Sequence, residues 1–196
     1  GSSPDWKRMR FTMDKEMSEA VNNAFISLYN DGLIYKDKRL VNWDTKLQTA
    51  ISDLEVEQKE KEGEFVYIKY FLKNNADFLE VATTRPETIF GDTGIAVHPD
   101  DKRYKKFIGS SVTIPLTNTL IPVIADDYVD KSKGSGVLKI TPAHDFNDYV
   151  IGKKHNMQFK IIFDKKGKFD ENVPEKYRGL DRVESRKEII SALKKK

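Results

Sequence analysis

The chain has 196 residues, of which 33% are charged and 38% are hydrophobic, and its formal net charge is +3. This length allows one domain with a buried core, and the composition is that of a folded chain rather than a disordered one. The net charge is too small to indicate nucleic-acid binding by itself. The absence of cysteine excludes disulfides and thiolate metal sites, and no apolar run is long enough to span a membrane.

The first clear pattern in chain order is that of an amphipathic helix from Asp14 to about Asn30. Its apolar residues recur at helical spacing, and the Asp14 side chain can cap the first turn. We expect this apolar stripe to pack into the core. It comprises Met17, Val21, Ala24, Phe25 and Leu28.

Short β-type runs, separated by charged or glycine-containing turns, fill most of the remaining chain. The runs at 111–115 and 120–125 flank a Thr-Asn-Thr turn, which predicts a hairpin. Further turns are expected at 59–63 and 74–77, and a last helix from about Arg182. The strands that we expect are Leu33–Tyr35, Arg39–Trp43, Ile51–Glu57, Glu64–Leu72, Phe78–Thr84, Ile95–Val97, Ser111–Pro115, Leu120–Ala125, Val137–Thr141 and Phe159–Phe163.

Many short strands with a few helices between them predict a mixed α+β domain, in which a β-barrel-like core has helices packed outside it. Gly1–Ser3 resembles an expression scar, so we exclude it and expect residues 4–196 to be one domain of a larger protein. Within this domain we expect a leading helical segment at 4–35, a β-rich core at 36–181 and a closing helix at 182–196.

The densest group of polar residues lies between Val137 and Tyr149, where a strand, a corner at Pro142 and a helix start follow one another. A lysine and a threonine two residues apart share one face of the strand. Two aspartates three residues apart share one side of the helix start. The sequence therefore predicts a polar pocket. Its side chains are Lys139, Thr141, His144, Asp145 and Asp148.

The two aspartates also have a structural interpretation, because acids at a helix N-terminus satisfy free backbone N–H groups. Asp145 fits such a cap. Asp148 lies one turn further in and fits it less well, so it suits a positively charged ligand group, such as an α-ammonium. The two carboxylates could instead act as general acid and base.

A second polar cluster occupies the strand-to-helix corner at Thr83, Thr84, Arg85 and Thr88. Its hydroxyls, guanidinium and free N–H groups could bind an oxyanion or a phosphate. The alternative is a threonine-rich strand followed by a capped helix, with no ligand.

Metal and nucleophile motifs are not supported by the residue spacing. His98, His144 and His155 fit no zinc pattern, and the two aspartates lack the glycine and the distal glutamate of a calcium loop. No Gly-x-Ser-x-Gly elbow is present. We therefore predict no metal ligand and no protein nucleophile.

Both polar clusters resemble the signatures of a known family, the editing domain of class I aminoacyl-tRNA synthetases. The stretches that carry this resemblance are Val81–Thr88, Gly91–Thr93, Val97–Pro99 and Gly134–Tyr149. Three further stretches are similar to the valyl branch of the family, namely Leu40–Asp44, Thr49–Glu57 and Tyr177–Arg182. The H-I-G-H and K-M-S-K-S motifs of the synthetic site are absent from this sequence, so the resemblance is to the editing domain alone.

The resemblance implies that the domain hydrolyses the ester of threonyl-tRNA(Val) by water attack, with threonyl-adenylate as a second candidate substrate. It implies no cofactor in this domain, since ATP serves only the synthetic domain. The implied partners are the 3′ acceptor end of tRNA(Val), the threonine moiety and the rest of the synthetase, in the cytoplasm and without a membrane. The alternative is a non-catalytic module that binds the tRNA acceptor end through a basic and aromatic surface.

The resemblance also implies a role for each polar residue. Asp148 holds the substrate ammonium, and water is oriented by neighbouring side chains and a ribose hydroxyl. The residues implied in catalysis are Asp148, Asp145 and Lys139. The residues implied in substrate binding are Thr83, Thr84, Arg85, Thr88, Thr141 and His144.

Overall fold

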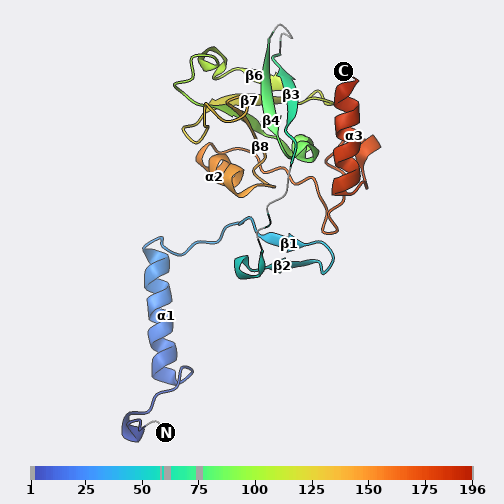
Figure 1. Cartoon of the computed structure of the whole chain (residues 1–196). Helices are drawn as coiled ribbons and strands as arrows, with labels where there is room; N and C mark the ends of the chain where they lie inside the picture. The colour runs from blue at the N-terminus through green and yellow to red at the C-terminus, as the bar shows by residue number, and fades with distance from the viewer. Residues whose placement is uncertain (1–2, 58, 60–62, 74–76, 196) are drawn as a thin grey trace. The chain divides into compact units, whose positions relative to one another are not determined.

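The computed structural model describes residues 3–57, 59, 63–73 and 77–195. The turns expected at 59–63 and 74–77, and the first two residues of the expected scar, therefore fall largely or wholly outside the described residues. The chain forms two compact units, Gly1–Arg39 and Leu40–Lys196 (Figure 1). The domain limits expected from the sequence stay a prediction.

The first unit contains a short 3₁₀ helix, η1 (Trp6–Arg8), and the predicted helix α1 (Lys15–Asn30). The Asp14 carboxylate caps α1 by accepting a hydrogen bond from the Met17 N–H at 2.8 Å. The expected core packing of α1 is wrong, because none of its residues is buried and Phe25 is 55% exposed. A lone helix has no second layer in its own unit against which to bury a stripe. The strand expected at Leu33–Tyr35 is also not formed.

The second unit contains eight described strands: β1 (Asn42–Asp44), β2 (Thr49–Ile51), β3 (Val66–Phe71), β4 (Phe78–Thr83), β5 (Gly94–Val97), β6 (Ser111–Thr113), β7 (Leu120–Ala125) and β8 (Val137–Ile140). Its α-helices are α2 (Phe146–Lys154) and α3 (Arg182–Lys194). Its 3₁₀ helices are η2 (Asp53–Glu55), η3 (Pro86–Gly91), η4 (Lys105–Phe107) and η5 (Glu175–Tyr177).

Three further expected strands are corrected by the structure. The run Arg39–Trp43 is a strand only at its last two residues, which begin β1. The run Ile51–Glu57 is a strand only at its first residue, because a capping box between Ser52 and Glu55 starts η2. The run Phe159–Phe163 is not a strand, and only Phe163 forms an isolated bridge, to Phe169. In Ile51–Glu57 a local capping signal prevailed over the β-type pattern, and in Phe159–Phe163 the Ile162 N–H donates to His144 Nε2 instead of to a neighbouring strand.

The described strands form two two-stranded sheets, β1-β2 and β3-β4, and one four-stranded sheet in the order β6-β7-β5-β8. The β6–β7 pair is antiparallel, which confirms the predicted hairpin, whereas β5 and β7 are parallel. An antiparallel bridge from Leu72 to Val112 connects β3 with β6, and β4 contacts β8. The mixed α+β class is confirmed. Closure into a barrel is not observed, since no ladder among the described residues pairs β4 with β8.

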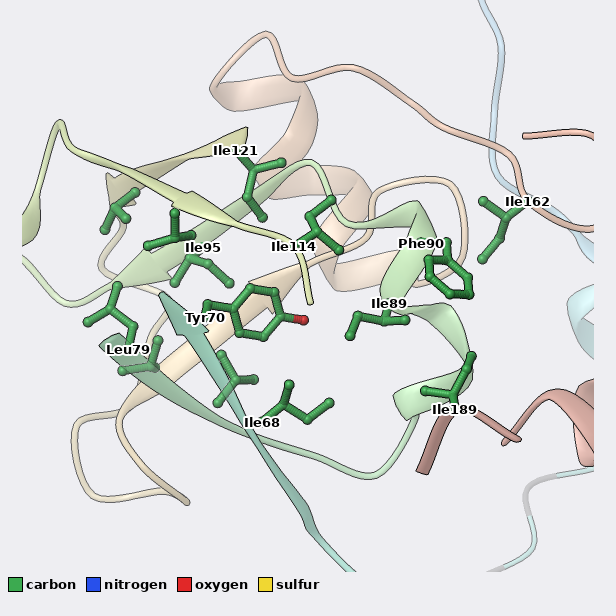
Figure 2. Close-up of a cluster of buried hydrophobic side chains, with 14 of the residues drawn as sticks. Ile68, Tyr70, Leu79, Ile89, Phe90, Ile95, Ile114, Ile121, Ile162 and Ile189 are labelled. Carbon is green, nitrogen blue, oxygen red and sulfur yellow. The ribbon is translucent and has the colours of Figure 1, made fainter. Parts of the chain in front are cut away.

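The main core lies between β3, β4 and the four-stranded sheet (Figure 2). Residues on β3 alternate in burial, so Ile68 and Tyr70 face inward while Tyr67 and Lys69 are exposed. Helix α3 packs onto η3, with Ile189 fully buried. No helix in the described part of the chain is long and apolar enough to span a membrane.

Candidate functional site

A cavity of about 590 Å³ lies where the end of β4 and the corner after it meet β8 and the residues that follow β8. Every residue that the sequence analysis selected lines it, although the two clusters are more than fifty positions apart in the chain. These lining residues are Thr83, Thr84, Arg85, Thr88, Lys139, Thr141, His144, Asp145 and Asp148. The structure thus brings both predicted clusters together, whereas their chemical roles stay predictions.

The first cluster is held by the corner between β4 and η3. Pro86 occupies the start of η3, where its missing N–H costs no hydrogen bond. The Thr83 hydroxyl accepts from the Arg85 N–H at 3.1 Å, and the Thr88 hydroxyl donates to the Arg85 carbonyl at 3.0 Å. All residues of η3 are buried. The corner is therefore a rigid wall of the cavity.

Helix α3 braces the same corner from outside the cavity. The Arg186 guanidinium donates to the Thr84 carbonyl, and its Nη1 lies 3.2 Å from the Glu87 carboxylate. Glu87 is only 6% exposed, so Arg186 supplies the cation that this buried acid needs. The closing helix thus contributes directly to the shape of the site.

Lys139 on β8 is the centre of a buried polar network. Its ammonium donates to Thr88 Oγ1, Asp92 Oδ1 and Thr141 Oγ1 over 2.5–2.8 Å. These three acceptors equal the number of N–H groups on a lysine ammonium. The Thr141 hydroxyl in turn donates to Asp92 Oδ1 at 2.7 Å. Lys139 therefore forms a buried ion pair with Asp92, and the hydroxyls of Thr88 and Thr141 complete the hydrogen bonds of its ammonium.

Two residues of this network were not selected from the sequence, namely Asp92 and Tyr70. The side chain of Asp92 is completely buried, and its Oδ2 accepts a hydrogen bond from the Tyr70 phenol at 2.6 Å. Asp92 lies within the Gly91–Thr93 motif, so the signal was present but was not linked to Lys139. For Tyr70 the sequence offered only the alternation of strand β3, which places its side chain in the core but does not indicate a polar partner.

Asp148 lies in the first turn of α2 and points back to the end of β8. Its Oδ2 accepts from the Thr141 N–H at 2.8 Å. Burial raises the pKa of the Asp148 carboxyl to about 6, although the Thr141 N–H and the Lys139 ammonium both favour its charged form. Asp148 is therefore ionised at neutral pH but loses its charge under mildly acidic conditions.

Asp145 is the N-cap of α2, as the structural interpretation of this residue predicted. Its Oδ1 accepts from the Asn147 N–H at 2.9 Å and from the Asp148 N–H at 3.2 Å. Its Oδ2 lies 3.8 Å from the Arg85 guanidinium, and both side chains are about 40% exposed. Asp145 thus orients the helix that carries Asp148, and any direct part in catalysis stays a prediction.

His144 is a neutral imidazole with a structural role in the cavity wall. Burial lowers its pKa to about 4, and the nearby Arg85 and Lys139 cations add to this effect. Its Nε2 accepts from the Ile162 N–H at 3.1 Å, while the His144 carbonyl accepts from Arg85 Nη1 at 2.7 Å. The residue can therefore offer a neutral ring and a fixed backbone to a ligand, but not a positive charge.

The loop between β7 and β8 completes the opposite wall. Gly134 has a φ of +60°, and a side chain there would lie 2.9 Å from the Ala82 Cβ on β4. Glycine thus allows the loop to approach β4 closely. The sequence analysis did not select the following lining residues of the cavity: Phe65, Tyr128, Asp130, Lys133 and Asn147. Among the described residues, no group of three or more His, Asp or Glu could hold a metal ion.

Comparisons with known proteins agree with the resemblance seen in the sequence. Residues 1–179 match the family model for class I tRNA synthetases (I, L, M and V). A valine–tRNA ligase of Dechloromonas aromatica is 55% identical over 193 residues, which are 98% of this chain and 20% of that protein. A valine–tRNA ligase of Pelagibacter ubique is 53% identical over 196 residues, which are 100% of this chain and 22% of that protein. The chain therefore spans about a fifth of the length of the curated relatives that it matches.

A similar fold is found in a LeuRS from Agrobacterium radiobacter K84, solved in a ternary complex with tRNA and LeuAMS. The TM-score is 0.54 at 17% sequence identity, and the match covers 94% of this chain and 32% of that protein. At this identity the likeness concerns the fold alone.

Proposed function

Because the chain belongs to the family of class I tRNA synthetases, we propose that it works as the editing domain of a valyl-tRNA synthetase and hydrolyses threonyl-tRNA(Val). The observation that supports this proposal best is the buried polar network at the cavity floor. Lys139, Thr141 and Thr88 line the cavity with an ammonium and two hydroxyls, and all three residues are almost completely buried.

Such a floor can separate threonine from valine, which have nearly the same size. Valyl-tRNA synthetases are themselves a well-known example of the underlying problem, since a hydrophobic site rejects an isostere with a hydroxyl only weakly. A threonine hydroxyl can bond to the polar floor. A valine methyl can form no hydrogen bond with these groups, and it would displace water from a polar surface without replacing the hydrogen bonds of that water. The cavity therefore favours the substrate that the synthetic site fails to exclude.

The remaining lining residues suit the other parts of an aminoacyl ester. Asp148 carries a negative charge above pH about 6 and can pair with the α-ammonium of the amino acid. The Arg85 guanidinium, which is 42% exposed, can meet the ester or the terminal adenosine of tRNA. In this proposal the nucleophile is water, oriented by these polar groups and by a ribose hydroxyl.

The domain would work within a larger synthetase and on the 3′ end of a tRNA. Residues 4–196 would act as one editing domain within a cytoplasmic synthetase, together with the 3′ end of tRNA(Val). Threonyl-adenylate is a second candidate substrate. No cofactor is required for ester hydrolysis by this set of residues, since ATP would serve the synthetic domain.

The test is the hydrolysis of threonyl-tRNA(Val) and valyl-tRNA(Val) by the chain and by the synthetase that contains it. We expect the threonyl ester to be hydrolysed and the valyl ester to be spared. The substitution Asp148→Ala should abolish hydrolysis. Asp127→Ala is a matched control, because Asp127 is exposed and does not line the cavity.

Two outcomes would contradict this proposal. Unchanged turnover in Asp148→Ala would exclude the role given to that carboxylate. Binding of tRNA(Val) by the intact synthetase without cleavage of the threonyl ester would favour a non-catalytic module that holds the acceptor end.

A further inference from the structure

Tyr70 is completely buried in the core (Figure 2), yet its phenol donates a hydrogen bond to the carboxylate of Asp92. We propose that Tyr70 is a positioning residue of the editing site, which fixes Asp92 and, through it, the ammonium of Lys139. The functional part of this inference rests on the proposed hydrolase activity, whereas the structural part can be tested without it.

The three hydrogen bonds of Asp92 show how the phenol acts. Asp92 Oδ1 accepts from Lys139 and from Thr141, while Oδ2 accepts from Tyr70 at 2.6 Å. The Asp92 side chain is 0% exposed, so water cannot readily replace a lost partner. Neither Asp92 nor Tyr70 lines the cavity. Any effect of Tyr70 on the substrate must therefore pass through the side chains that do line it.

The arrangement around Lys139 explains why an anchor is needed. Its three N–H groups are already matched by Asp92, Thr88 and Thr141. A substrate hydroxyl that bonds to this ammonium has to replace one of the two threonine acceptors. The bond to Asp92 can persist during this exchange only if the carboxylate keeps its orientation. Tyr70 supplies this restraint from the hydrophobic core, since it does not line the cavity.

The surroundings of Tyr70 indicate that the hydroxyl is not needed for packing. The ring lies among apolar side chains, including Ile68, Leu79 and Ile95, where phenylalanine would fit as well. A buried hydroxyl is costly unless it is bonded. Burial and the Asp92 charge also raise the pKa of Tyr70 well above its usual value, so the phenol remains a donor. Without it, Asp92 Oδ2 would lose its partner, and the carboxylate could rotate out of the orientation in which Oδ1 accepts from Lys139.

The experiment compares Tyr70→Phe with Tyr177→Phe. Tyr177 is a matched control, because it is 3% exposed and its hydroxyl has no partner in the described part of the chain. Two quantities are measured for each protein. The first is kcat and KM for threonyl-tRNA(Val). The second is the rate at which acetic anhydride modifies Lys139, followed by mass spectrometry of peptides, with the exposed Lys187 as internal reference.

We expect Tyr70→Phe to lower kcat by about tenfold or more, since a hydrogen bond to a charged group is worth about 1.5–3 kcal/mol. We also expect Lys139 to react several times faster, because its anchor is loosened. Tyr177→Phe should change neither quantity. If Tyr70→Phe behaves like Tyr177→Phe, or lowers kcat with Lys139 reactivity unchanged, the inference is wrong.

The two proposals fail in different ways. If the wild-type protein does not hydrolyse threonyl-tRNA(Val), the proposed function fails, but a faster modification of Lys139 in Tyr70→Phe still supports the positioning role. If Tyr70→Phe does not fold, Asp92→Asn provides the second test, since it weakens the same ion pair and keeps the phenol. Lys139 should then react faster as well, and an unchanged rate would contradict the inference.

Discussion

The substitution Asp148→Asn should stabilise the protein at neutral pH and remove its hydrolytic activity. Asp148 is 8% exposed, and burial raises the pKa of its carboxyl from the ordinary 3.8 to about 6. The ionised carboxylate therefore costs folding free energy at pH 7. Asparagine retains an oxygen that can accept the hydrogen bond from the Thr141 N–H. The substitution thus removes a charge with little change in shape.

The magnitude follows from the difference in proton affinity between the folded and unfolded states. A rise in the pKa of Asp148 from 3.8 to about 6 corresponds to about 3 kcal/mol, since each pKa unit is worth about 1.36 kcal/mol. The folded protein holds a proton between about pH 4 and pH 6 that the unfolded chain has released. The free energy of unfolding of the wild type therefore decreases as the pH rises from about 4 to about 6. We expect Asp148→Asn to be more stable by up to about 3 kcal/mol at pH 7.5 and equally stable near pH 4.

The assay is urea unfolding of both proteins, followed by circular dichroism at several pH values from about 4 to 7.5. Taking the difference between variant and wild type cancels the titration of all other groups. In parallel, the hydrolysis of threonyl-tRNA(Val) by the wild type should rise with pH through about 6, as Asp148 becomes ionised, and should be absent in Asp148→Asn. A variant that is less stable at neutral pH, or a stability difference that does not depend on pH, would refute this reasoning.

Three further predictions concern the groups around the cavity. Lys139→Met leaves Asp92 buried without its cation and should lower the free energy of unfolding by about 3–5 kcal/mol. The additional substitution Asp92→Asn should restore a large part of this loss. Urea unfolding in which the losses of the two substitutions add up would contradict this prediction. Arg186→Ala frees the Thr84 carbonyl and should raise KM for threonyl-tRNA(Val) severalfold with little change in kcat, so an unaltered KM would exclude the bracing role of α3. Hydrolysis should persist in the presence of EDTA, and its loss would indicate a metal-dependent reaction.

Several elements of the fold could be predicted because short stretches of sequence carry their own signals. The helix after Asp14 and the β6–β7 hairpin were located by capping, periodicity and turn residues. The apolar stripe of α1 and the run Phe159–Phe163 were misjudged. Both have a plausible local pattern, but burial and strand pairing require partners that a local pattern does not contain.

The candidate site could be predicted in the same partial way. The lining residues that were selected come from two contiguous stretches, 83–88 and 139–148, so residue type and spacing were sufficient to find them, whereas lining residues such as Phe65 and Tyr128 lie outside both stretches. The residues behind the lining were not found. Asp92 and Tyr70 are separated by 22 positions, and Asp92 and Lys139 by 47. No local periodicity links such distant positions.

The sequence by itself therefore determined which polar groups are available and which neighbours share a strand face or a helix turn, because these relations extend over only a few residues. The tertiary structure alone decided that both clusters meet in one cavity and that Tyr70 reaches Asp92. It also decided that Asp148 is buried deeply enough for its pKa to rise. Burial and electrostatic interaction depend on distance in space, and the groups that surround Asp148 and Lys139 are assembled from strands and helices that lie far apart in the chain.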